Sequence, residues 1–105
     1  MHTQIITYHL KDLSQKEYCQ LCEPLAPIIA AQPGLIEKVW LADPATSTYG
    51  GIYKWQDRAA MAAFMQTDLV KGFASHPAIV GLASQDFPVW EEATRVTRGL
   101  AAERV

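Results

Sequence analysis

The sequence predicts an α+β domain in which four antiparallel strands and two helical segments follow the order β-α-β-β-α-β. Three observations support this: β-rich runs over residues 3–10, 35–42, 48–55 and 83–94, helical periodicity after the first run, and an alanine-rich segment after the third. This order is the ferredoxin-like plan. Right-handed crossovers would place both helical segments on one face of the sheet and leave the other face bare.

The first strand and the helix after it are predicted from residue preference and capping. The first run is rich in Ile, Thr and Tyr, which favour strands, and it carries apolar side chains on both faces. Ser14 and Glu17 form a capping-box pattern, and an apolar stripe with helical spacing follows. Pro24 and Pro27 interrupt this stripe, so we expect the helix to kink or break near Cys22.

Residues 33–55 predict a β-hairpin, because two β-rich runs flank a turn cluster of Asp, Pro, Thr and Ser. The pair Gly50-Gly51 inside the second run predicts that the backbone there comes close to another group. Lys38 lies among apolar and aromatic neighbours, where burial of its ammonium is costly unless something pairs with it. We therefore expect the hairpin to carry the working surface.

The second half of the chain predicts helical segments and a last strand. Asp57 is a suitable N-cap for the alanine-rich helix, whose apolar face carries Met61 and Phe64. A shorter helical piece with Phe73 follows. The last strand is expected over residues 83–94, where Pro88 implies a sheet edge or a bulge.

The composition is that of one globular domain and excludes several classes of function. With 105 residues, we expect a single domain over residues 1–97 and a flexible tail over 98–105. A net charge of -2 without a basic cluster argues against nucleic acid binding. No apolar run is long enough to cross a bilayer and no secretory signal is visible, so we expect no membrane contact and a cytoplasmic location.

The second strand is apolar on both faces, which predicts a homodimer. A monomer would expose an apolar patch on the order of several hundred Å², and such patches usually mark interaction surfaces. Two sheets that close face to face would bury it. The expected interface residues are Leu35, Val39, Leu41 and Ile52.

The hairpin resembles a known family. The runs from Pro33 to Trp40 and from Gly50 to Trp55 are similar to those of the YdhR family of mono-oxygenases, in the dimeric α/β-barrel superfamily that includes the antibiotic-biosynthesis monooxygenases. The similarity covers most of residues 4–92, and the hairpin is its distinctive part. The resemblance implies a dimeric α/β barrel and a cofactor-independent oxygenase that uses O2 on a small aromatic or quinol-like molecule.

Such chemistry requires a dry pocket, a proton acceptor, and a cation or hydrogen-bond donors for the developing oxyanion. The hairpin can supply these if Trp40 pairs with Gly51, which would leave room for the Trp40 ring. A shift of one residue would send half of the set to the opposite face. The other pairs on this face would be Lys38 with Tyr53 and Ile36 with Trp55.

Lys38 and His9 are the expected catalytic residues. Lys38 could stabilise an oxyanion or bind a ligand carboxylate, or its stem could pack while its ammonium reaches solvent. His9 could act as general base near Tyr53 or Trp55, or simply be satisfied by a neighbour. Core packing is the alternative role for the aromatic residues. The residues expected to bind the substrate in the cleft under the helices are Trp40, Gly51, Tyr53, Trp55, Met61, Phe64 and Phe73. Of these, Met61, Phe64 and Phe73 are expected to form a lid.

No metal or cofactor is expected. Cys19-x-x-Cys22 lacks a second cysteine pair or a close histidine pair, so both thiols are expected in the core. The chain has no phosphate-binding loop that opens a helix. Two other functions stay open: a non-catalytic ligand-binding or interaction module, and a haem-degrading oxygenase with His9 or His76 as axial ligand.

Overall fold

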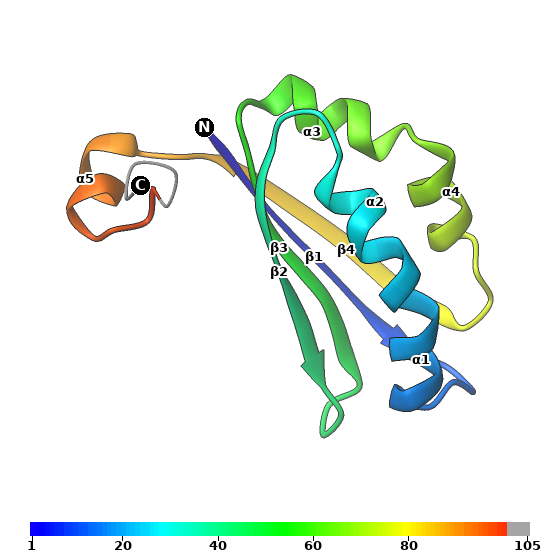
Figure 1. Ribbon diagram of the computed structural model, residues 1–105. Coiled ribbons are helices and arrows are strands. Elements are labelled where there is room, and N and C mark those ends of the chain that lie inside the picture. The colour runs from blue at the N-terminus through cyan, green and yellow to red at the C-terminus, as the bar shows by residue number, and fades with distance from the viewer. Residues whose placement is uncertain (101–105) are drawn as a thin grey trace.

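The sheet and the helices follow the predicted order. The computed structural model describes residues 1–100. Its antiparallel sheet has the strand order β2-β3-β1-β4, and helices lie over one face (Figure 1). The α+β, ferredoxin-like prediction is confirmed. The strands are β1 (His2–Leu10), β2 (Leu35–Asp43), β3 (Thr48–Trp55) and β4 (Ile79–Pro88), and the covering helices are α1 (Gln15–Cys22), α2 (Ala26–Ala30), α3 (Arg58–Met65) and α4 (Asp68–Ala74).

The first helical segment begins and breaks where the sequence predicts. The Ser14 side chain accepts a hydrogen bond from the Glu17 backbone N–H at 3.1 Å, and the Glu17 carboxylate accepts one from the Ser14 N–H at 3.0 Å. These bonds hold the pKa of Glu17 below its ordinary value. Helix α1 ends at Cys22, and a 3-10 turn containing Pro24 separates it from α2, in which Pro27 is the second residue.

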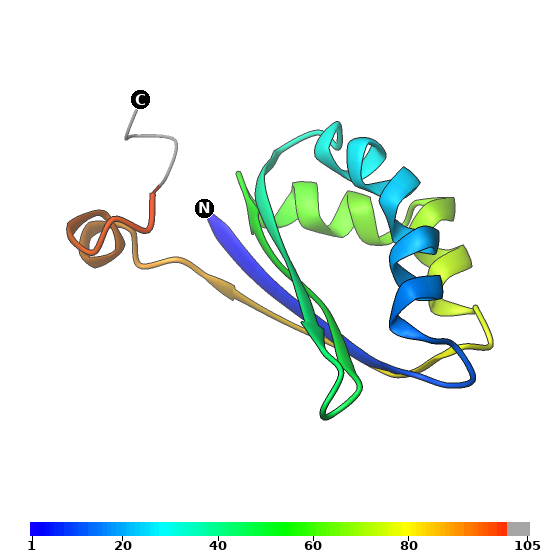
Figure 2. The same ribbon diagram turned by 60° about the horizontal axis from the view of Figure 1, so that its bottom comes forward.

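The end of the chain differs from the sequence prediction. Strand β4 starts at Ile79 rather than at residue 83 and stops at Pro88, and residues Glu91–Val96 form helix α5. Two glutamates in the first turn of α5 favour a helix there through the helix dipole. Figure 2 shows α5 beyond the end of β4 and away from α1–α4. None of the helices in residues 1–100 is long and apolar enough to span a membrane.

The predicted tail lies only partly within the described residues. The Gly99 carbonyl accepts a hydrogen bond from Lys54 Nζ, and Leu100 is buried. Residues 101–105 lie outside the described residues, so the flexible tail over 98–105 and the domain limit at residue 97 stay predictions.

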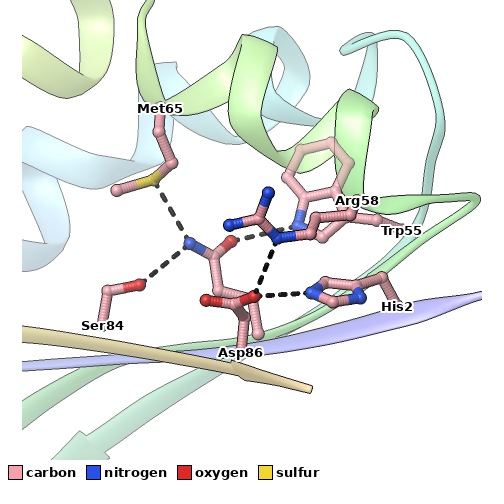
Figure 3. Close-up of polar contacts among 7 residues, drawn as sticks. His2, Trp55, Arg58, Met65, Ser84 and Asp86 are labelled. Carbon is pink, nitrogen blue, oxygen red and sulfur yellow. Dashed lines mark hydrogen bonds and ion pairs between the residues drawn. The ribbon is translucent and has the colours of Figure 1, made fainter. Parts of the chain in front are cut away.

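A buried polar network fixes one end of the core between β1, β3 and α3. Trp55 is fully buried, and its indole N–H donates to Gln4 Oε1 at 3.0 Å. Gln4 in turn donates to Ser84 Oγ at 3.1 Å, next to a hydrogen bond of 2.6 Å between His2 Nε2 and the Asp86 carboxylate (Figure 3). The paired amide and indole let Trp55 serve as a core residue despite its polar atom.

Candidate functional site

An apolar cavity lies between the sheet and the helices. Counted out to its open mouth, it encloses about 570 Å³ of space free of protein atoms. Its lining is mostly aliphatic and aromatic with a few polar groups, which is the character of sites that bind small organic molecules. The residues that line it are Ile6, Tyr8, Cys22, Leu25, Ile29, Lys38, Trp40, Tyr53, Phe64, Met65, Leu69, Val70, Phe73, Ala74 and Leu82.

The hairpin register brings the predicted aromatic residues to Lys38. Trp40 pairs with Gly51 and Lys38 pairs with Tyr53, which is the register that the expected site requires. The role of Gly51 is different from the one expected. A Cβ atom at this position would lie 2.6 Å from Lys38 Cε and 3.3 Å from the Tyr53 ring. Gly51 therefore makes room for the Lys38 stem rather than for the Trp40 ring.

A β-bulge at the start of the hairpin makes the strand pairing there differ from the expected one. The register between β2 and β3 shifts between Leu35 and Glu37, so Leu35 pairs with Trp55 and the expected pair of Ile36 with Trp55 is wrong. The shift also turns Leu35 toward the helices, where it packs against the core. Leu35 therefore does not belong to the opposite face, where it was expected at a dimer interface.

Lys38 places an ammonium inside this apolar cavity. Its Nζ lies 3.2 Å from the centroid of the Trp40 ring and 4.7 Å from that of the Tyr53 ring. Within residues 1–100 no carboxylate forms an ion pair with it. Burial lowers the pKa of Lys38 to about 8, and only the nearby Cys22 opposes this shift. Aromatic faces thus replace the carboxylate that a buried lysine ordinarily needs.

Two tyrosine hydroxyls form a hydrogen-bonded pair in the core, and the Cys22 thiol lies near Lys38. The hydroxyls of Tyr8 and Tyr18 share a hydrogen bond. Burial raises the pKa of Tyr8 to about 12 and also raises the pKa values of Tyr18, Cys22 and Tyr53. These groups therefore keep their protons near neutral pH, and they can donate hydrogen bonds but do not act as bases there.

Sequence reasoning missed Tyr8 and Cys22 as cavity residues. Tyr8 is on the helix-covered face of β1 with Ile6, because the buried residues of this strand alternate with less buried ones. Apolar side chains on both faces of β1 hid this alternation in the sequence. Cys22 lies on the apolar stripe of α1 and lines the cavity, whereas Cys19 is exposed and not in the core as expected.

His9 does not reach the cavity. It pairs with Thr48 in β3 and Val80 in β4, far along the strand from Trp55, which pairs with His2. Its side chain is exposed, and Nδ1 lies 2.9 Å from the Ser47 carbonyl oxygen. His9 follows Tyr8 in the strand and therefore projects to the opposite face. The expectation that it acts near Tyr53 or Trp55 is wrong.

The remaining predicted residues divide between cavity and core. Phe64 and Phe73 line the cavity together with Lys38, Trp40 and Tyr53. Trp55 and Met61 are buried in the core and do not line it. Among residues 1–100, no three His, Cys, Asp or Glu side chains gather as metal ligands could.

The fold and the cavity define a class of protein: a ferredoxin-like α+β domain with an aromatic-walled hollow under its helices. A family model described as "Putative mono-oxygenase ydhR" matches residues 5–100, and the chain belongs to this family. A comparison with curated proteins finds no significant match.

Solved structures share the fold. One is SnoaB from Streptomyces nogalater, a cofactor-independent oxygenase, at 16% identity and a TM-score of 0.68, covering 86% of this chain and 93% of that chain. A "putative antibiotic biosynthesis monooxygenase" from Deinococcus radiodurans has 15% identity and a TM-score of 0.70, with 87% and 94% covered. The haem degrader MhuD from Mycobacterium tuberculosis has 17% identity and a TM-score of 0.66, with 86% and 96% covered. At these identities the likeness concerns the fold.

Proposed function

We propose that the protein is a cofactor-independent mono-oxygenase that binds a small aromatic or quinol-like molecule in the cavity and promotes its reaction with O2. The observation that carries the proposal is the ammonium of Lys38, which lies within an apolar, aromatic-walled cavity without a carboxylate partner in residues 1–100. Membership of the mono-oxygenase ydhR family and a fold shared with a cofactor-independent oxygenase support it.

Lys38 replaces His9 as the proton acceptor in this proposal. With a pKa of about 8, a fraction of Lys38 is a neutral amine near neutral pH and can take a proton from an acidic O–H or C–H of the substrate. The resulting ammonium then stabilises the phenolate or enolate at the same place.

The substrate anion supplies the electrons for O2. For a substrate with an activated CH2 group, the balanced reaction converts CH2 and O2 into a carbonyl and water. One oxygen atom enters the substrate, and the other leaves with both hydrogens. The apolar walls, including Phe64 and Phe73, would keep bulk water from the reacting anion.

Oxygen uptake with a panel of hydroquinones and anthrone-like substrates tests the proposal. We expect uptake that matches substrate loss and a decrease on the order of 100-fold or more in Lys38→Met, the range typical for loss of an acid–base group. Lys16→Met, on the exposed side of α1, is the matched control and should keep full activity. No uptake above buffer across the panel would end the enzyme proposal. A ligand that raises the melting temperature and remains unchanged by mass spectrometry would then favour a non-catalytic binding module.

The haem-degrading alternative receives no support from the cavity. An axial histidine would have to face the bound group, but among residues 1–100 no histidine lines the cavity. His9 is on the opposite face, and the His76 ring accepts a hydrogen bond from the Ala78 backbone N–H. The residues present do not fit a haem held in this way, and no Soret shift is expected on addition of haemin.

The same proposal includes a homodimer that buries the uncovered face of the sheet. Val39 and Ile52 pair across β2 and β3 on this face and are 53% and 37% exposed. Ile5 pairs with Ile52 from the next strand, so an apolar row crosses three strands. A second copy offers the same row, as a two-fold interface requires. Free Cys19 and Cys22 thiols fit the cytoplasm as the expected compartment.

A further inference from the structure

We propose that the cavity selects planar aromatic ligands that carry one negative charge, with the Lys38 ammonium as their counter-ion. This inference rests on the proposed function in one respect, because it takes the cavity as the substrate site. It goes further by naming the shape of the bound molecule and the single negative charge that it carries beside Lys38, the charge that the proposed phenolate or enolate also has.

The charges around the cavity are unbalanced. Lys38 is the one residue with a charged side chain among those that line the cavity in the described part of the chain. The nearest carboxylate along its own strand, Glu37, is engaged 2.9 Å from Lys54 Nζ. A buried cation with no anion is costly, and aromatic faces recover only part of its lost hydration. A ligand with one negative charge restores neutrality, whereas a second charge would have no partner in the cavity.

The other titratable groups that face Lys38 are neutral near pH 7. Helix α1 contributes Cys22, β1 contributes Tyr8, and β3 contributes Tyr53, while Tyr18 of α1 is hydrogen-bonded to Tyr8 and does not line the cavity. Each has a pKa raised by burial, so each is a hydrogen-bond donor and not a second charge. Helices α3 and α4 contribute only apolar lining residues.

The walls favour a flat ring. The Tyr53 ring is tilted against Phe64 with centroids 5.7 Å apart, and Trp40 covers the Lys38 ammonium. A planar aromatic ligand can lie against these rings while an anionic group on its edge reaches Nζ. Such a ligand satisfies the cation and the apolar wall together.

Naphthoate and its uncharged isostere naphthamide test the charge selection, with affinities from titration calorimetry. Naphthoate is expected to bind roughly 10- to 100-fold more tightly, the range of a charge-assisted hydrogen bond. Lys38→Met should remove this preference, Lys38→Arg should keep it, and Lys16→Met should match the natural chain. Naphthalene dicarboxylate should bind more weakly than naphthoate, because its second carboxylate has no partner.

The pH dependence gives a second readout. Naphthoate binding should weaken as the pH rises above about 8, because Lys38 loses its charge there. The Lys38→Arg variant should not show this loss, since arginine stays charged. Naphthamide binding should change little over the same range.

Equal affinity for naphthoate and naphthamide, or a preference that survives in folded Lys38→Met, would overturn the inference. If Lys38→Met does not fold, Lys38→Arg still tests the inference, because this variant should keep the preference for naphthoate and should not lose it at high pH. The two proposals fail separately. If the protein prefers naphthoate but takes up no oxygen with any substrate, the oxygenase proposal alone is wrong. If it takes up oxygen with neutral hydroquinones and shows no preference for naphthoate, the charge selection alone is wrong.

Discussion

Lys38 lies opposite Tyr53 in the hairpin, and its ammonium lies over the Trp40 ring at 3.2 Å. A cation–π contact returns only part of the hydration that a buried ammonium loses. The pKa of Lys38 therefore falls from 10.5 to about 8, although the nearby Cys22 opposes the change. The folded protein tolerates a charge that it does not pair, which is a common property of sites that await a ligand.

This environment predicts an unusual dependence of stability on pH. Between about pH 8 and 10.5 the unfolded chain holds the Lys38 proton and the folded chain has released it. Because the unfolded state then binds more protons, the free energy of unfolding should rise with pH across this window, by roughly 1 to 3 kcal/mol. Urea denaturation of the natural chain and of Lys38→Met at several pH values measures this change in the free energy of unfolding.

The difference between the two proteins isolates Lys38, because both contain the same tyrosines. Burial raises the pKa values of Tyr8, Tyr18 and Tyr53, so their contribution to stability is lost as the pH rises above about 10 and is common to both proteins. Identical pH profiles for the two chains would contradict the assignment.

At the level of elements, local signals in the sequence predicted more than long-range ones. The capping box at Ser14 and the helix break beside Pro24 each depend on a few neighbouring residues, and both are present in the structure. The turn between the two strands predicted the hairpin but left its register open, and the pairing of Trp40 with Gly51 is the register that occurs. The bulge near Ile36 could not be predicted, since an extra apolar residue in an apolar strand leaves no distinct pattern.

The candidate site was only partly predictable for the same reason. Lys38 and Tyr53 share a hairpin, so their proximity depends on one turn. His9 depends on how β1 aligns with β3, and that register places it beside Thr48. The residues around His9 do not indicate which face of the sheet its side chain takes, because β1 is apolar on both sides.

Gly51→Ala tests the fit of the hairpin around Lys38. The new Cβ would lie 2.6 Å from Lys38 Cε and 3.2 Å from the Val39 carbonyl oxygen. We expect a loss of about 1 to 3 kcal/mol in the free energy of unfolding, as in other overpacked sites. Naphthoate affinity should also fall, because the displaced stem moves the ammonium.

Gly72→Ala is the matched control for this substitution. It lies within α4, and nothing would meet its Cβ within 4 Å. It should stabilise the protein by about 0.5 to 1 kcal/mol through helix propensity and leave naphthoate binding unchanged. If Gly51→Ala behaves like this control in urea denaturation and in calorimetry, the close packing of Lys38 against β3 is wrong.

At the scale of the whole molecule, the two faces of the sheet have different surroundings. Helices α1–α4 cover one face and enclose the cavity, and no helix within residues 1–100 covers the other (Figure 2). That uncovered face carries the apolar row of Val39, Ile52 and Ile5 from three neighbouring strands. Exposed apolar rows of this kind favour association, and a second copy of the chain is the partner that we propose.

Val39→Glu is expected to convert a dimer into a monomer in analytical ultracentrifugation. Val39 is 53% exposed in the single chain and pairs with Ile52, so a glutamate here would meet apolar side chains and lose hydration on association. Ile28→Glu is the control, because Ile28 is 49% exposed but belongs to α2 on the covered side. It should sediment as the natural chain does. A natural chain that is monomeric at all concentrations, or a Val39→Glu variant that stays dimeric while Ile28→Glu dissociates, would place the interface elsewhere or remove it.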